Sequence, residues 1–195
     1  MARTKDFDEH EVLTKAIQLF WHKGYNATSM QDLVDTLGIS RSSLYDTYID
    51  KHTLFLKALE SYQLAGKAKI DEIVARSISA KETVVKLMEL ATTDLVGGKQ
   101  QMGCFVVNAG VEVAAHDPDV SKLVCQNEQL MEAAFFQAIR NGQQSGEVKN
   151  TEDALVLAKF IFHVVKGMQV TAKSSPDTSS FANTIRVTVA VLNPG

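Results

Sequence analysis

Apolar residues recur at helical spacing along most of this chain, and only three of its 195 residues are prolines. From Asp8 to Lys23 the apolar side chains fall on one face of an amphipathic helix, which Gly24 can end. Five later segments lack the alternation of a β-strand over useful lengths, and we expect helices there as well. They are residues 80–96, 103–116, 119–142, 151–173 and 178–192. The pattern predicts an all-α fold.

Two short helices joined by a glycine-containing turn are predicted in the first quarter of the chain. Ser29 followed by Asp32 resembles a capping box that opens the first of them. Gly38 ends it, and Ser40 can cap the second, Arg41–Tyr48. Two such helices form a helix-turn-helix unit when their facing sides are apolar, although an ordinary helical hairpin uses the same kind of turn. The apolar side chains available for this small core are Leu33, Leu37, Ile39 and Leu44, with Leu13, Ile17 and Phe20 of the first helix.

The chain is expected to divide after its third helix. Asp50 can cap a longer helix that runs from Lys51 to about Arg76. We therefore predict an N-terminal three-helix helix-turn-helix domain at residues 1–52 and a second domain at residues 53–195. In the second domain, residues 53–76 form a connecting helix that leads into a bundle of about five helices.

Composition places the chain among ordinary globular proteins, with 45% hydrophobic and 22% charged residues. The net charge of −3 argues against binding nucleic acid through bulk charge, since proteins that do so are usually basic. Residues 1–52 themselves hold six basic and eight acidic side chains. Any contact of this region with DNA must therefore use helix N-termini, hydroxyl groups and a few cations.

The cysteines and the most apolar stretch point to a cytoplasmic protein. Cys104 and Cys125 cannot form a disulfide framework, and neither lies in a zinc-binding spacing. No apolar segment near the N-terminus resembles a signal peptide. The most apolar stretch, 154–165, is interrupted by Lys159 and His163 and is too short for a membrane span, so we expect no membrane contact.

The chain shows no motif of an enzyme. Nucleophile elbows, phosphate loops and metal motifs are absent from the sequence, so we predict no catalytic residues and no cofactor. Glu112 and His116 lie four residues apart on a predicted helix, but two ligands alone seldom form a metal site. Two alternatives stay open: a small enzyme that uses Cys104 with His116 or His163, and a helical adaptor that binds another protein.

From Val12 to Leu54 the sequence resembles the DNA-binding domain of the TetR/AcrR family of transcriptional repressors. The positions that carry the resemblance are Val12-Leu13, Ala16, Leu19-Phe20, Gly24-Tyr25, Thr28-Ser29, Leu37-Gly38-Ile39-Ser40, Leu44-Tyr45, Asp50-Lys51 and Leu54. Val34, Thr47-Tyr48 and His52 depart from the usual pattern of the family. The resemblance implies a helix-turn-helix that reads DNA, followed by helices that bind a small ligand and form a dimer.

The N-terminal turn of the second short helix would enter the major groove, because a recognition helix contacts base edges with its first residues. Arg41 could bind a guanine in bidentate fashion, and Ser42 and Ser43 could bond to several bases. Tyr45 resembles a family tyrosine that contacts the DNA backbone, and Lys51 lies at a helix N-terminus that favours phosphate. Further candidates for DNA contact are Thr28, Ser29, Gln31, Thr47 and Tyr48, of which Tyr48 could equally pack in the domain core.

The segment Met102–Asn108 (MGCFVVN) looks like one subgroup of the family, with a Gly-Cys motif as in NemR-like relatives. Cys104 could act there as a sensor of oxidants or electrophiles, or it could be a small buried thiol that does not react. The candidate ligand pocket comprises Met88, Cys104, Phe105, Asn108, Glu112, Phe135 and Phe160. Apolar side chains at helical spacing are more often core than ligand site, so the core remains an alternative for them.

Two segments near the C-terminus are candidates for a dimer interface. Residues 151–173 are apolar around most of the predicted helix, and residues 178–192 add a second apolar face. They could form a four-helix interface across a two-fold axis, or they could merely complete the core of the monomer. The expected protein is a homodimeric repressor that binds a palindromic operator and is released by a small-molecule effector or a thiol-reactive signal. The sequence equally allows an activator, or a regulator that needs its ligand to bind DNA.

Overall fold

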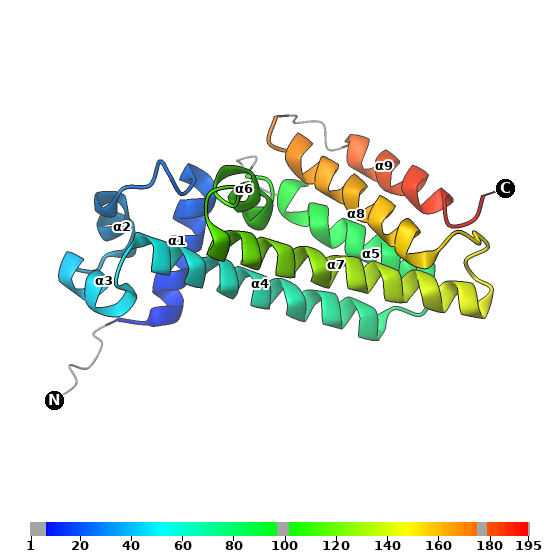
Figure 1. Ribbon diagram of the computed structural model, residues 1–195, viewed down its shortest axis with the longest axis horizontal. Coiled ribbons are helices and arrows are strands. Elements are labelled where there is room, and N and C mark those ends of the chain that lie inside the picture. Colours follow the sequence, from blue (N-terminus) through cyan, green and yellow to red (C-terminus); the bar gives the residue numbers. More distant parts are fainter. Residues whose placement is uncertain (1–6, 97–101, 175–178, 195) are drawn as a thin grey trace.

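The computed structural model describes residues 7–96, 102–174 and 179–194, and within these ranges every regular element is a helix. Figure 1 shows α1 to α3 at one end of an elongated molecule, α4 leading away from them, and α5, α8 and α9 toward the other end. The helices are α1 (Glu9–Lys23), α2 (Met30–Leu37), α3 (Arg41–Tyr48), α4 (Lys51–Arg76), α5 (Ala80–Val96), α6 (Phe105–Glu112), α7 (Pro118–Ser145), α8 (Ala154–Thr171) and α9 (Ser179–Ala190). The predicted all-α fold is confirmed.

The first helices begin and end where their capping residues predict. Ser29 and Asp32 form a complete capping box at the start of α2. Gly38 ends α2 in the left-handed conformation, with φ of 68°. Ser40 and Asp50 accept hydrogen bonds from backbone N–H groups in the first turns of α3 and α4.

Several later helices differ from their predicted bounds because of local caps. The predicted helix 103–116 is shorter, since α6 ends at Glu112 and a turn follows. Asp117 caps α7, and Pro118 occupies the first helical position. Proline suits that position because the N–H group that it lacks would have no acceptor within the helix. Asp153 caps α8, so that helix starts at Ala154 rather than at residue 151.

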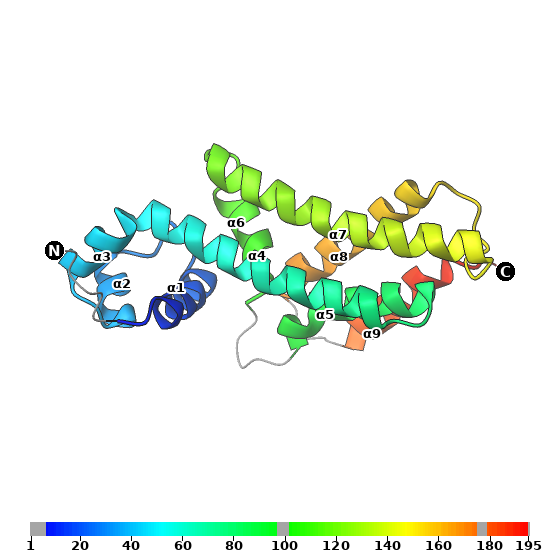
Figure 2. The ribbon, with the colours of Figure 1, turned by 90° about the horizontal axis from the view of Figure 1, so that it is seen from below.

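Two long helices run along the molecule: α4 leads from the first three helices to the far end, and α7 leads there from α6. Both α4, of 26 residues, and α7, of 28 residues, extend along the long axis (Figures 1 and 2). The helix α6 lies between the first three helices and the rest, where it contacts α1, α4 and α7. The helices α5, α7, α8 and α9 pack together at the far end.

The buried apolar residues form two clusters, which we call the proximal core and the distal core. The proximal core joins α1, α2, α3 and the first part of α4 to α6 and the start of α7. The distal core joins the end of α4 to α5, α8, α9 and the rest of α7. The proximal core thus continues past residue 52, and the domain division after residue 52 stays a prediction.

The helix α8 is long and apolar enough to pass a length-and-composition test for a membrane span, contrary to the sequence-based expectation. Its 18 residues have a mean hydropathy of 1.4, and 44% of them are buried inside the protein. A buried core helix passes the same test. The helix α8 packs against α7 and α5 through its buried side.

Candidate nucleic-acid interface and ligand pocket

The first turn of α3 presents polar side chains to solvent. Arg41 and Ser42 are exposed and Ser43 is half-buried. The Ser40 hydroxyl accepts a hydrogen bond from the Ser43 N–H at 3.1 Å and bonds to the hydroxyls of Ser42 and Ser43 at 2.9 and 2.8 Å. The guanidinium carbon of Arg41 lies 5.9 Å from the ring centroid of Tyr45, which is 41% exposed. This end of α3 therefore offers a cation, three hydroxyls and a half-exposed ring on one surface.

The helix α2 adds a smaller polar surface. The Gln31 amide is exposed and donates to the Asp35 carboxylate at 2.8 Å. Asp32 accepts from the Lys23 ammonium at 2.6 Å and from both the backbone and the hydroxyl of Ser29. These bonds, the one from Lys23 first, hold the pKa of Asp32 well below its usual range. Lys23 is therefore paired, and Arg41 is the cation that stands free at this surface among the described residues of α2 and α3.

Two of the predicted DNA contacts, Thr28 and Tyr48, have side chains that are buried in the structure, so we do not retain them in the proposed interface. Thr28 is 1% exposed, and its hydroxyl donates to the Gly24 carbonyl at 2.6 Å. Tyr48 is 0% exposed and belongs to the proximal core, where its hydroxyl has no hydrogen-bond partner among the described residues. In α3, Leu44 and Tyr48 face the core because they are four residues apart.

Lys51 is occupied within the protein. Its ammonium donates to the carbonyls of Tyr25 and Thr28 at 3.0 and 2.9 Å, and it lies 4.3 Å from the Tyr25 ring centroid. Burial lowers the pKa of Lys51, and nearby Glu112 partly offsets that effect. The structure thus uses Lys51 to hold the turn between α1 and α2.

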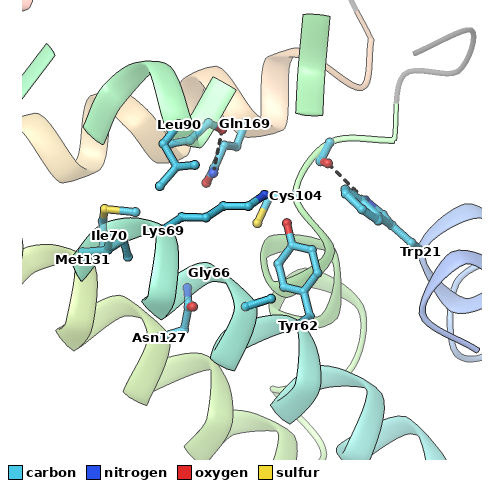
Figure 3. A pocket seen from close by; sticks show the side chains of 13 residues that line it. Trp21, Tyr62, Gly66, Lys69, Ile70, Leu90, Cys104, Asn127, Met131 and Gln169 are labelled. Carbon is cyan, nitrogen blue, oxygen red and sulfur yellow. Dashed lines mark hydrogen bonds between the residues drawn. The ribbon is translucent and has the colours of Figure 1, made fainter. Parts of the chain in front are cut away.

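A cavity of about 300 Å³ lies where the two cores meet. It is lined from α1, α4, α5, α7, α8 and the segment before α6 (Figure 3). The lining residues are Trp21, Tyr62, Ala65, Gly66, Lys69, Ile70, Leu90, Ala91, Gly103, Cys104, Asn127, Met131 and Gln169. Trp21 ties this cavity to α1, because its indole N–H donates to the carbonyls of Met102 and Gly103 at 3.1 and 3.0 Å.

Of the seven pocket residues predicted from sequence, Cys104 alone is among those that line this cavity. Met88 and Phe135 are fully buried in the distal core, and Phe105 is buried in the proximal core. Phe160 is 46% exposed on the outer side of α8, because Leu157 and Ile161 lie on the side of the helix that faces the core.

The remaining two predicted pocket residues, Asn108 and Glu112, lie on α6 and have structural partners. The Asn108 amide donates to the Met102 carbonyl at 2.8 Å. The Glu112 carboxylate accepts from the backbone N–H groups of Tyr25 and Asn26 at 3.0 and 2.7 Å. These two bonds connect α6 to the turn after α1.

Sequence reasoning missed most of the cavity, although α4 carries a pattern that could have indicated it. Tyr62, Gly66 and Lys69 follow one another at helical spacing, with a glycine in the middle of a long helix. A Cβ added at Gly66 would meet no heavy atom within 4 Å, which is consistent with open space beside this face.

His52 and Asp117 link the start of α4 to the start of α7. The His52 Nε2 atom lies 2.7 Å from a carboxylate oxygen of Asp117. Burial raises the pKa of Asp117, but the Val120 N–H and the His52 ring outweigh it and hold that pKa low. Asp119 brings a third potential metal ligand within 4.8 Å. The cap of α7 and the bond to His52 already account for the Asp117 carboxylate.

The two cysteines differ in access. Cys125 is exposed, whereas Cys104 is buried and lines the cavity. Burial raises the pKa of the Cys104 thiol, although N–H groups of α6 and the nearby Lys166 partly oppose this. Cys104 is therefore a thiol, not a thiolate, at neutral pH.

Two family models match this chain. The model "Bacterial regulatory proteins, tetR family" matches residues 12–58, which include the helix-turn-helix. The model "Tetracyclin repressor-like, C-terminal domain" matches residues 80–188, more than half of the chain. The chain belongs to the TetR family. This is a family of transcriptional regulators rather than of enzymes.

Curated relatives support the assignment to the TetR family over the whole length. The chain is 31% identical over 194 residues to the HTH-type transcriptional regulator YezE of Bacillus subtilis, covering 99% of this chain and 100% of YezE. It is 27% identical over 172 residues to the HTH-type transcriptional repressor ComR of Escherichia coli, covering 88% of this chain and 82% of ComR.

Solved structures share the fold of this TetR-family chain. A cysteine mutant of the regulator CifR, in complex with 26-base-pair operator DNA, has a TM-score of 0.81 at 25% identity and covers 99% of both chains. The reduced form of NemR from E. coli has a TM-score of 0.82 at 18% identity, covering 92% of this chain and 93% of NemR. The likeness to NemR shows the fold alone.

Proposed function

We propose that this TetR-family protein is a cytoplasmic repressor that binds a palindromic operator as a homodimer and leaves it when a small molecule enters the cavity. The observation that carries the proposal is the exposed first turn of α3, at the point where a helix-turn-helix contacts base edges. The relatives ComR, a repressor, and CifR, bound to operator DNA, support it.

The DNA contacts that we propose are the accessible ones. Arg41 reaches a guanine through two hydrogen bonds, and Ser42 and Ser43 contact neighbouring bases. Tyr45 contacts phosphate at the side of α3. Weaker contacts come from exposed or half-buried side chains at the edges of this surface, namely Ser29, Gln31 and Thr47.

The proposed dimer uses α8 and α9. Leu155, Val156 and Phe160 leave 43%, 54% and 46% of their surface exposed on α8, and Val187 leaves 58% exposed on α9. Apolar side chains gathered on two neighbouring helices are typical of a surface that another subunit covers. A second copy of the chain would place two recognition helices about one DNA turn apart.

Trp21 provides the path from the cavity to the DNA. It belongs to α1 of the helix-turn-helix, yet its indole lines the cavity and bonds to the segment before α6. A ligand that displaces the indole would change the position of α1 relative to α6. Release requires the ligand to bind the conformation that cannot bind DNA more tightly than the one that can.

Selection of bound sequences from random DNA, followed by substitution of Arg41, tests this function. We expect a palindromic product, and we expect Arg41→Ala to weaken binding by about 1–3 kcal/mol and relax specificity at one base position. Arg76→Ala is the matched control, because Arg76 is an exposed arginine at the far end of α4. Unchanged affinity of the Arg41→Ala protein for the selected sequence would refute the proposed interface.

A thiol-reactive signal, the NemR-like alternative, has one supporting observation: Cys104 lines the cavity, so a reagent that enters can reach it. Its buried, protonated thiol reacts slowly, which favours reversible ligand binding. Treatment with N-ethylmaleimide distinguishes the two. If alkylation releases DNA from the natural protein and not from a Cys104→Ser variant, the thiol is the sensor.

A further inference from the structure

We propose that the cavity binds a small organic carboxylate, with the carboxylate on Lys69 and the apolar part of the molecule against Trp21, Ile70, Leu90 and Met131. This inference deepens the proposed function and rests on it for its regulatory consequence. The binding itself depends only on the cavity, so it can be measured without DNA.

Charge is the first argument. Lys69 is the single ionisable cation among the described residues that line the cavity, and no described acidic side chain lines it. Lys69 is an exposed residue at this lining, and Figure 3 shows its side chain extended along the cavity. No ion pair joins Lys69 to another described residue, unlike Lys67 on the same helix, which pairs with Asp71.

The surroundings of Lys69 add to the case for an anion. Lys166, whose charge acts on the nearby Cys104 thiol, is neutralised by Glu128 at 2.8 Å. Among the described residues that line the cavity, Lys69 therefore supplies the charge that no described carboxylate pairs with. The lining also includes the amides of Asn127 and of Gln169, whose nitrogen donates to the Ala91 carbonyl at 3.1 Å, so the other polar groups of the lining are uncharged. A charge-assisted bond from an ammonium to a carboxylate is about twice as strong as a neutral one.

Size and apolar lining define the rest of the ligand. A cavity of about 150 Å³ in a protein core holds benzene, so about 300 Å³ suits a ligand of roughly a dozen non-hydrogen atoms. Ile70, Leu90 and Met131 surround this volume on the side of the distal core. One cation at the end of an apolar cavity matches a molecule with one negative charge and an apolar body.

A titration with three probes of equal length tests the inference on the full-length protein. Hexanoate, hexanamide and hexylamine carry a negative, a neutral and a positive head on similar apolar chains. Trp21 is the only tryptophan of the chain, so its fluorescence reports occupancy of the cavity directly. We expect hexanoate to bind about tenfold more tightly than hexanamide, and hexylamine to bind most weakly.

Three variants assign the effect to Lys69. Lys69→Met should remove the preference for hexanoate over hexanamide, whereas Lys67→Met, the control on the same helix, should keep it. Lys69→Glu should make hexylamine the preferred probe. Urea unfolding checks that each variant retains the stability of the natural protein.

Equal affinity for the three probes, or a hexanoate preference that survives in Lys69→Met, would overturn the inference. Operator binding is measured separately on the same proteins. A protein that binds hexanoate but no DNA would contradict the proposed function and leave the ligand class intact. A protein that binds its operator but shows no charge preference among the probes would contradict the ligand class and leave the proposed function intact.

Discussion

The proximal and distal cores are built from different side chains. In the proximal core the rings of Phe20, Tyr25 and Phe105 surround Phe55, with centroids 4.6 to 5.8 Å from it. Tyr62 extends this ring cluster toward Trp21 at 5.3 Å. The distal core is mainly aliphatic, and among its described residues Phe162 alone makes a ring contact, with His163.

The two cores connect different parts of the molecule. The ring cluster of the proximal core runs from α1 through α4 to α6, so its contacts are continuous from the helix-turn-helix to the wall of the cavity. The distal core holds together the helices α5, α7, α8 and α9, and the proposed dimer uses the outer faces of α8 and α9. The cavity lies at the boundary, with Trp21 and Tyr62 on one side and Ile70 and Met131 on the other.

Truncation of one ring in each core is the strongest test of this comparison. Phe55→Ala and Phe135→Ala each remove a fully buried side chain, and each should lower the free energy of unfolding by about 3–5 kcal/mol. We expect Phe55→Ala alone to shift Trp21 fluorescence in the folded protein. Urea unfolding and emission spectra measure both effects. An equal spectral shift in Phe135→Ala would show that the two cores are not separate.

Two glutamates provide a second, smaller pair of tests. Glu112 accepts from two successive backbone N–H groups at the junction of α1 and α6, and Glu147 accepts from Ala80 and Lys81 at the start of α5, both at 2.8 Å. Replacement by alanine should cost about 1–3 kcal/mol of stability in each case, because N–H groups lose their acceptor. We expect operator affinity to change only in Glu112→Ala. A matching change in Glu147→Ala would argue against the special role of the proximal side.

Tyr48→Phe tests the proximal core and the DNA interface together. The Tyr48 hydroxyl is buried without a described partner, so its removal should stabilise the protein by about 1 kcal/mol and leave operator affinity unchanged. Burial, with a smaller contribution from Glu9, raises the pKa of Tyr48 to about 12. The neutral ring therefore stabilises the fold below pH 10, and this contribution is lost as the pH rises from about 10 to 12. In the Tyr48→Phe variant, the unfolding free energy measured against pH should lack the decrease between about pH 10 and 12. Weaker operator binding by this variant would indicate that Tyr48 contacts DNA.

The smallest effect is expected at Gly66, between the two cores. Glycine inside a helix costs about 0.5–1 kcal/mol relative to alanine, and the added methyl group meets nothing within 4 Å. Gly66→Ala should therefore raise the unfolding free energy by about that amount. Destabilisation in thermal unfolding would show that this side of α4 is more tightly packed than the structure indicates.

The parts predicted well from sequence are those with local causes. Ser29, Gly38 and Ser40 act on the turns next to them, so the bounds of α2 and α3 could be derived from neighbouring residues. The cavity depends instead on segments far apart in the sequence. Phe105 and Phe160 are both aromatic and lie on apolar helices, yet one is buried in a core and the other faces outward. Only the packing of helices decides between these outcomes.

The connections around the recognition helix are very short. Three residues join α2 to α3, and two residues, Ile49 and Asp50, join α3 to α4. Ile49 has a φ of 66°, which is uncommon for a β-branched residue and leaves that turn few other conformations. These connections leave α3 little freedom relative to α2 and α4. Under the proposed function we therefore expect an effector to displace the whole helix-turn-helix together with the start of α4, rather than α3 alone.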